Sequence, residues 1–375
     1  MIRFLFLLLF LIGTSLQGQT VSTFLSDAAA DVDDDMEFDS SGNLYGSNFA
    51  GDTVYKIDAS GVATVFVDGL ANPNGIAIDS GSNVFIVEYS AGTIHKYSSA
   101  GALIQSYAVG DFPSGLEKSP SSDDMYFTLT SNSSVNILSP DGTITEVFQG
   151  APLDIPVGLA FDDDENLYVG NYIGGDIHRV TLGNAVYLAN VPTDGGGSSP
   201  FLAFIAYGNG KLWGTIYGSH KIYKVGLETN DDVSLFAGSA QGSDDGPIAD
   251  ATFDNPGGIV FNSAQNAMYI SEFSGAGNIR RIDDIPLAVN DLSLNLDFVI
   301  SPNPSADFIS VRIPSNSGLE ITQLAVYNVN GALIETKSVN ESLARLPVAN
   351  LPSGVYFLKA TTSDGSSGYR SFIKK

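Results

Sequence analysis

Most residues of this chain that could do chemistry are carboxylates and amides. The acidic run DVDDD occupies residues 31–35, and NPNGIAID at residues 72–79 places an asparagine between a proline and a glycine. Their oxygen atoms are the ligands that hard divalent cations prefer. The acidic run is not an EF-hand loop, because its sixth residue is Met36 and its twelfth is Gly42. A cation would therefore need ligands from several parts of the chain.

Nucleophilic catalysis has little support. The chain contains no Cys and three His, and it has no G-x-S-x-G motif of the kind that exposes a catalytic serine. His95 and His178 occupy one position of the repeat described below, where other copies carry Tyr or Arg. We therefore interpret them as residues of a strand surface and expect no Ser-His or Cys-His pair.

The elements that position these donors are expected to be β-strands. The 375 residues are 43% hydrophobic and 16% charged, which suffices for more than one buried core. Forty Gly, abundant Asn, Asp and Ser, and few runs of helix-forming residues favour an all-β chain.

A strand-rich unit is repeated six times. Residues 36–58 align without a gap on residues 76–98, and four further copies occupy residues 116–139, 159–181, 205–225 and 259–283. Each copy predicts three strands, and a fourth follows in all but the last. The segment TVSTFL at residues 20–25 is predicted to complete the last unit and so to close a ring.

One aromatic residue falls at the same position of the second strand in each copy. These residues are Tyr45, Phe85, Tyr126, Tyr168, Trp213 and Tyr269. We expect them to pack between adjacent sheets, since face-to-face packing needs a large side chain at a fixed position. The alternative is a platform on which bases or sugars stack.

The repeats resemble known propellers. The segment GSDDGPIADATFDNPGGIVF at residues 242–261 resembles the NHL repeat, and PNGIAID is similar both to that repeat and to the gluconolactonase and senescence-marker-protein propellers. The resemblance covers residues 20 to about 285 and implies a six-bladed β-propeller. It does not fix the function, because this architecture serves enzymes and binding proteins alike.

The resemblance also implies where a cation would bind. In the gluconolactonase-like propellers, calcium or zinc is held by carboxylates and amides where inner strands begin, around the central channel. The matching positions here are Asp34, Asn74, Ser114, Val157, Phe201 and Gly257. The ends of the second strands, expected at the same rim, are Asn48, Glu88, Leu129, Asn171, Ile216 and Glu272. The predicted metal ligands are Asp34, Asn74, Glu88 and Glu272, with Ca²⁺ as the expected ion; alternatively, these side chains bond turns of the blades.

The first residues predict export. Arg3 precedes the apolar run FLFLLLFLIG at residues 4–13, which is too short to span a bilayer, and small and polar residues follow. We predict a signal peptide over residues 1–18 and no transmembrane segment after it.

The charge is distributed unevenly. The net charge is −25, and residues 1–289 hold 35 acidic and 10 basic side chains, whereas residues 290–375 hold 7 of each. An acidic surface repels nucleic acid and anionic lipid, so neither is an expected partner. We predict two domains, residues 19–289 and residues 290–375.

The second domain predicts about seven short strands, which suggests a small immunoglobulin-like sandwich. Its motifs are Pro302-Asn303-Pro304, Asn330-Gly331, LPSGVY at residues 351–356 and a terminal Lys374-Lys375. Together they resemble the type A sorting domain of the type IX secretion system of certain Gram-negative bacteria. The resemblance implies export by that machinery, then release or attachment to the cell surface.

The sequence favours a secreted or surface-displayed binding module over an enzyme. The expected ligand is a small molecule, a glycan or a protein bound at the propeller channel. The alternative function is a divalent-cation-dependent lactonase or esterase.

Overall fold

The computed structural model describes residues 19–193, 201–285, 298–313, 319–328, 333–363 and 367–375, so the predicted signal peptide lies outside the described residues. In this part of the chain every regular element is a β-strand, as the composition predicts. The described residues contain no helix long and apolar enough to cross a membrane. The chain divides into two compact units, Met1–Leu287 and Ala288–Lys375.

Five sheets of the first unit each consist of four strands joined in chain order. Sheet 1 contains β2 (Met36–Phe38), β3 (Leu44–Ser47), β4 (Val54–Ile57) and β5 (Ala63–Val67). Sheet 2 contains β6 (Pro73–Ile78), β7 (Val84–Glu88), β8 (Thr93–Tyr97) and β9 (Leu103–Ala108). Sheet 3 contains β10 (Pro113–Lys118), β11 (Met125–Leu129), β12 (Ser134–Leu138) and β13 (Ile144–Gln149). Sheet 4 contains β14 (Pro156–Phe161), β15 (Leu167–Asn171), β16 (Asp176–Thr181) and β17 (Asn184–Asn190). Sheet 5 contains β18 (Phe201–Gly208), β19 (Lys211–Tyr217), β20 (Lys221–Gly226) and β21 (Val233–Ala237).

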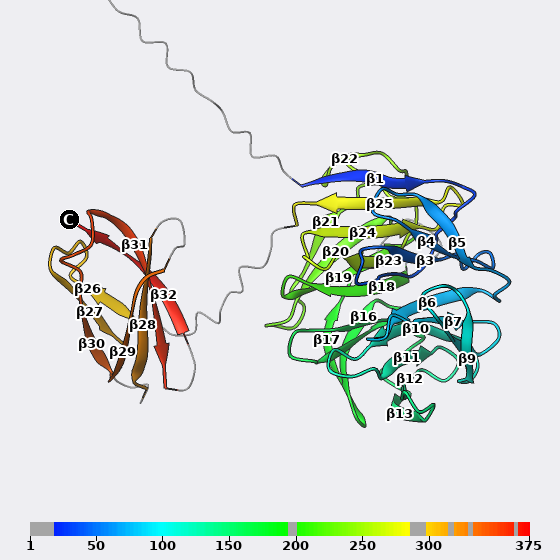
Figure 1. Cartoon of the computed structure of the whole chain (residues 1–375), viewed down its shortest axis with the longest axis horizontal. Helices are drawn as coiled ribbons and strands as arrows, with labels where there is room; N and C mark the ends of the chain where they lie inside the picture. The colour runs from blue at the N-terminus through cyan, green and yellow to red at the C-terminus, as the bar shows by residue number, and fades with distance from the viewer. Residues whose placement is uncertain (1–18, 194–200, 286–297, 314–318, 329–332, 364–366) are drawn as a thin grey trace, which may run out of the picture. The chain divides into compact units, whose positions relative to one another are not determined.

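The sixth sheet joins the two ends of the first unit. It contains β23 (Pro256–Phe261), β24 (Ala267–Glu272), β25 (Asn278–Asp283), β1 (Thr20–Ser26) and β22 (Gly246–Pro247). The strand β1 pairs antiparallel with β25, with Val21 opposite Ile282, and Figure 1 shows the two side by side. The N-terminal segment therefore completes the last sheet, in the place that the sequence predicts.

Aspartates shape the hairpins between first and second strands. Asp39 Oδ1 accepts hydrogen bonds from the backbone N–H groups of Ser41 and Asn43, and the Asn43 side chain donates back to Asp39 Oδ2. Asp79 and Asp162 make the same contacts with an asparagine four residues later. Such side-chain turns reverse the chain locally, which explains why the repeat carries an acidic residue there.

The aromatic residues of the second strands pack between sheets, as predicted. Five of the six are buried and Tyr126 is half-buried. Tyr126 contacts Phe161 of the next sheet at 5.0 Å between ring centroids, and Tyr269 contacts Phe38 of sheet 1 at 5.1 Å. These rings are part of the core and are not a stacking platform for ligands.

The six first strands contact one another in a closed ring, in the order β2, β6, β10, β14, β18 and β23. Close approach at this ring requires glycine. A Cβ atom at Gly115 would lie 1.9 Å from the carbonyl oxygen of Val157 in the neighbouring strand. The glycine of the recurring Pro-x-Gly is therefore needed where the neighbouring inner strands approach this closely.

The second unit consists of two sheets. One contains β26 (Val299–Ser301), β27 (Phe308–Arg312) and β30 (Leu343–Pro347). The other contains β28 (Ile321–Asn328), β29 (Leu333–Glu341), β31 (Gly354–Thr362) and β32 (Ser367–Lys374). Buried residues of both sheets form one core, which includes Val311, Val326 and Phe372. Asn303 fixes the chain end, because its Oδ1 accepts from the N–H of Ile373 and its Nδ2 donates to the carbonyl of Ser371.

Candidate functional site

A cavity of about 410 Å³ lies where the six inner strands begin. All six positions that the repeat alignment places there line it: Asp34, Asn74, Ser114, Val157, Phe201 and Gly257. A cavity of this size can hold a small molecule. We call these six positions the floor of the cavity.

A second set of six positions completes the wall. It consists of the residue that directly follows the predicted second-strand end in each sheet: Phe49, Tyr89, Thr130, Tyr172, Tyr217 and Phe273. Five of the six are aromatic. Together with Phe201 of the floor, we call these aromatic residues the collar.

Much of the collar is continuous. Tyr172 and Phe201 stack at 4.2 Å between centroids with an interplanar angle of 11°, and Phe201 lies 6.4 Å from Tyr217. Tyr217 meets Phe273 edge to face at 5.7 Å, and Phe49 meets Tyr89 at 5.4 Å. The wall is thus aromatic in every sheet except the third, where Thr130 stands.

The acidic run contributes three carboxyls with different surroundings. Asp33 accepts hydrogen bonds from the backbone N–H groups of Phe49 at 2.6 Å and Ala50 at 3.0 Å, and so fixes the start of the wall. Asp35 accepts from the N–H of Ile76 at 2.8 Å and links two inner strands. Burial raises the pKa of Asp33 and of Asp35 to about 7.

Asp34 is the carboxyl that the fold leaves free. Its backbone is held by Ser47 and by the Ser271 hydroxyl, whereas its side chain accepts no hydrogen bond from any residue that the structure describes. Burial, followed by repulsion from Asp33 and Asp35, raises the pKa of Asp34 well above its ordinary value. The Asp34 carboxyl also contributes, after burial and Tyr217, to raising the pKa of Tyr172 to about 12.

Asn74 offers a second free oxygen on the floor. Its side chain is 5% exposed, and its Nδ2 donates to Ser114 Oγ at 3.3 Å. Its Oδ1 is buried without a partner among the described residues. Asp34 and Asn74, both predicted as metal ligands, therefore line one cavity with unpaired oxygens.

Glu88 does not join them. Its Oε1 accepts from the N–H of Ala71 at 2.7 Å, and its Oε2 pairs with His95 Nε2 at 2.9 Å. His95 Nδ1 in turn lies 2.8 Å from Ser106 Oγ on the outer strand of the same sheet. The carboxylate of Glu88 is thus occupied within sheet 2, while Tyr89 lines the cavity in its place.

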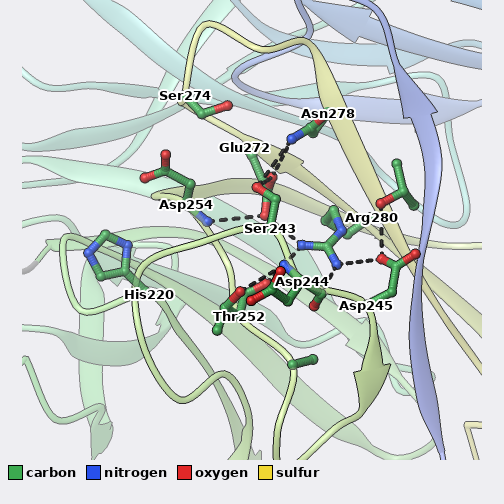
Figure 2. A network of polar contacts seen from close by, with 12 residues as sticks. His220, Ser243, Asp244, Asp245, Thr252, Asp254, Glu272, Ser274, Asn278 and Arg280 are labelled. Carbon is green, nitrogen blue, oxygen red and sulfur yellow. Dashed lines mark hydrogen bonds and ion pairs between the residues drawn. The ribbon is translucent and has the colours of Figure 1, made fainter.

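Glu272 is also occupied elsewhere. It is fully buried at the centre of the network in Figure 2, where its Oε1 forms an ion pair with Arg280 Nη1 at 3.0 Å. Its Oε2 accepts hydrogen bonds from Ser243 at 2.7 Å and Asn278 at 3.0 Å. The structure therefore does not bring Glu88 or Glu272 together with Asp34 and Asn74.

These donors do not complete a cation site. Calcium takes about six to eight oxygen ligands. The side chains of the floor that are free to act as ligands are the Asp34 carboxyl and the amide oxygen of Asn74. Among the described residues, no group of three His, Cys, Asp or Glu could hold a metal ion. Asp33, Glu88 and Asn171 follow the alternative interpretation. Each of them accepts a hydrogen bond from a backbone N–H group of a neighbouring turn.

A second cavity of about 270 Å³ lies further along the inner strands. Phe204 lines both cavities, and Glu37 and Glu117 line the second one from β2 and β10. Burial, and then the charge of Asp35, raises the pKa of Glu37 to about 8. Burial also raises the pKa of Glu117, with Glu37 and Asp35 as further causes. Sequence inspection missed this pair, although both residues fall at one position of the repeat.

Comparison with protein families identifies both units. A family model described as the virginiamycin B lyase family matches residues 12–250. The chain belongs to this family. A model described as a secretion system C-terminal sorting domain matches residues 299–375, which confirms the resemblance to a type IX sorting domain. That domain indicates secretion and a surface or extracellular location.

Several solved structures share the fold of this member of the virginiamycin B lyase family. A virginiamycin B lyase from Staphylococcus aureus is 16% identical, with a TM-score of 0.53 over 71% of this chain and 99% of that chain. A gluconolactonase from Xanthomonas campestris is 20% identical, with a TM-score of 0.54 over 71% and 89%. An auxiliary nutrient binding protein from Bacteroides ovatus is 15% identical, with a TM-score of 0.58 over 71% and 76%. A search of curated proteins found no match. The first unit is therefore propeller-like, in accord with the predicted resemblance to gluconolactonase-type propellers.

Proposed function

We propose that this protein is a secreted or surface-displayed binding module that holds a small molecule or glycan in the cavity at the mouth of its channel. In this proposal the six sheets are the blades of a six-bladed propeller over residues 19–289, and residues 290–375 form an immunoglobulin-like sandwich that the type IX machinery recognises. Residues 1–18 serve as the signal peptide.

The observation that carries the proposal is the aromatic collar, which lines the same cavity as the unpaired side-chain oxygens of Asp34 and Asn74. Aromatic side chains supply a large contact area with little loss of conformational freedom, and a few polar groups fix the orientation of a ligand. Five sheets contribute a collar residue at one equivalent position. The likeness to a nutrient binding protein supports a binding role.

The test is a thermal-shift screen of metabolites and glycans on the mature chain and on two variants. Thr130→Trp fills the cavity at the one wall position that lacks a ring, whereas Ser131→Trp adds the same bulk beside it. Each hydroxyl donates to a backbone carbonyl, Thr130 to Phe112 and Ser131 to Asp111, so the two variants lose matched contacts.

We expect ligands to raise the melting temperature of the wild type and of Ser131→Trp but not of Thr130→Trp. At a concentration of about 100 times Kd, the stabilisation is about 2.7 kcal/mol. Equal shifts in both variants, or a screen without a bound compound, would count against the proposal.

A second candidate is hydrolysis of a lactone or ester, with the divalent-cation dependence that the resemblance to gluconolactonases implies. It is favoured by Asp34 and Asn74, whose free oxygens line the cavity. Calorimetric titration with calcium, zinc and manganese, combined with lactone turnover by wild type, Asp34→Ala and Asn74→Ala, tests it. Absence of both cation binding and turnover would remove it.

A further inference from the structure

The unpaired polar atoms on the cavity floor are hydrogen-bond acceptors. Asp34 receives no hydrogen bond from a described residue, and Asn74 Oδ1 is buried without a donor. The Asn74 side chain already donates to Ser114, which leaves its oxygen to the cavity. A buried acceptor without a donor is unfavourable, so a ligand that fits this floor brings a hydrogen-bond donor for Asn74 Oδ1 or a positive charge for Asp34.

The cavity also lacks positive charge. The described residues that line it include two carboxyls, Asp33 and Asp34, and no Lys, Arg or His. Asp33 is compensated by the two backbone N–H groups that it binds, whereas Asp34 is not. An enclosed carboxylate is costly unless a cation accompanies it, so a ligand that supplies the compensating charge favours the ionised form of Asp34.

The collar determines what kind of cation fits. Tyr172, Phe201, Tyr217 and Phe273 form a continuous aromatic wall, and Phe49 and Tyr89 form a second stretch. A hydrated metal ion needs oxygen ligands that such a wall does not supply. An alkylated organic ammonium group, in contrast, is attracted to the faces of aromatic rings and needs no oxygen ligands.

The net charge of the first part of the chain also favours a positively charged ligand. Residues 1–289 hold 35 acidic and 10 basic side chains. A strongly acidic surface raises the local concentration of cations and repels anions, which speeds the encounter with a positively charged ligand.

We infer that the ligand of this cavity carries an organic ammonium group, held by the Asp34 carboxylate and enclosed by the aromatic collar. The inference rests on the proposed binding function and names the chemical class of the ligand. The carbon skeleton next to the ammonium group packs against the remaining rings of the wall.

The test compares choline with 3,3-dimethyl-1-butanol, its uncharged isostere, by calorimetric titration of the mature full-length protein at fixed ionic strength. We expect choline to bind at least about tenfold more tightly than the alcohol. Asp34→Asn should abolish this preference and leave the affinity for the alcohol unchanged. Because the structural contacts of Asp34 come from its backbone, the variant should fold, which an unchanged melting temperature would verify.

The control is Asp111→Asn, which removes an exposed carboxylate two residues before β10 and leaves the cavity lining intact. It should keep the preference for choline. Equal affinities for the two probes in the wild type, or a preference that survives in Asp34→Asn, would overturn the inference.

The experiment separates the two proposals. If the alcohol or a neutral compound of the screen binds, and Thr130→Trp prevents it, the cavity binds ligands and the ammonium inference alone is wrong. If choline, the alcohol and all screened compounds fail to bind, the binding function is wrong as well.

Discussion

Arg280 is a buried charge that connects several segments of the first unit. It is fully buried, and its guanidinium bonds Glu272 Oε1 at 3.0 Å and Asp245 Oδ1 at 2.7 Å. It also donates to the carbonyl oxygens of Thr252 and Asp244, as Figure 2 shows. One residue thus holds the segment before β23 against the last sheet.

We predict that Arg280→Met lowers the free energy of unfolding by about 3–5 kcal/mol, because it leaves the buried Glu272 carboxylate without its counter-charge. Urea unfolding of the mature chain measures the change. The control is Arg281→Met, whose guanidinium pairs with Asp283 and is 37% exposed, and which should cost about 1 kcal/mol or less. Equal losses in the two variants would contradict the argument.

The alternation of side chains along a strand explains which residues of the cavity could be predicted from the sequence. Successive side chains of a strand point to opposite faces, so Glu88 and Tyr89 cannot serve the same surface. The repeat alignment placed the ends of the second strands to within one residue, and all six floor positions line the cavity. The residues that line the wall lie one position after the polar strand ends that the sequence predicts as ligands. The signal for the wall is the aromatic residue that recurs at this next position in five of the six repeats.

The inner strands β2 and β10 bring two acidic residues to one cavity. Glu37 and Glu117 both line it, and burial raises the pKa of each, that of Glu37 to about 8 from an ordinary value of 4.5. The folded protein therefore holds protons there that the unfolded chain releases. Their contribution to stability is complete below about pH 4.5 and is lost as the pH rises towards 8.

We predict that the melting temperature of the first unit falls on the order of 5–10 °C between pH 5 and pH 8. The double variant Glu37→Gln/Glu117→Gln should show a smaller fall that does not vanish, because the pKa values of Asp33, Asp34 and Asp35 are raised as well. Glu146→Gln, on the exposed outer strand β13, should behave as the wild type. Scanning calorimetry at several pH values provides the measurement. A slope that the double variant leaves unchanged would contradict the assignment.

The elements themselves were more predictable than their side-chain contacts. Asx turns at Asp39, Asp79 and Asp162 are local, so the sequence shows where each hairpin reverses. The short strand β22, which pairs with β1, was not predicted. Its two residues, Gly246 and Pro247, carry no strand signal, and only the long-range pairing defines them.

The whole molecule combines a propeller-like unit with a sorting domain, and the two units have separate cores. We predict that a chain ending at residue 287 stays in the periplasm of a bacterium with a type IX system, whereas the full chain reaches the surface or the medium. Immunoblots of cell fractions provide the measurement. As a control, residues 288–375 fused to a periplasmic reporter should carry it out of the cell; export of the truncated chain would contradict the role of the domain.

The pairing of β1 with β25 also sets an order of events while the protein is made. Val21 leaves the ribosome about 260 residues before its partner Ile282. Until then the growing chain has an unpaired strand at its beginning and an open sheet edge at its end, and such edges pair readily with other chains. The ring therefore cannot close before β25 is available to pair with β1. A nascent or exported chain that stalls before residue 278 would remain prone to exchange strands with its neighbours.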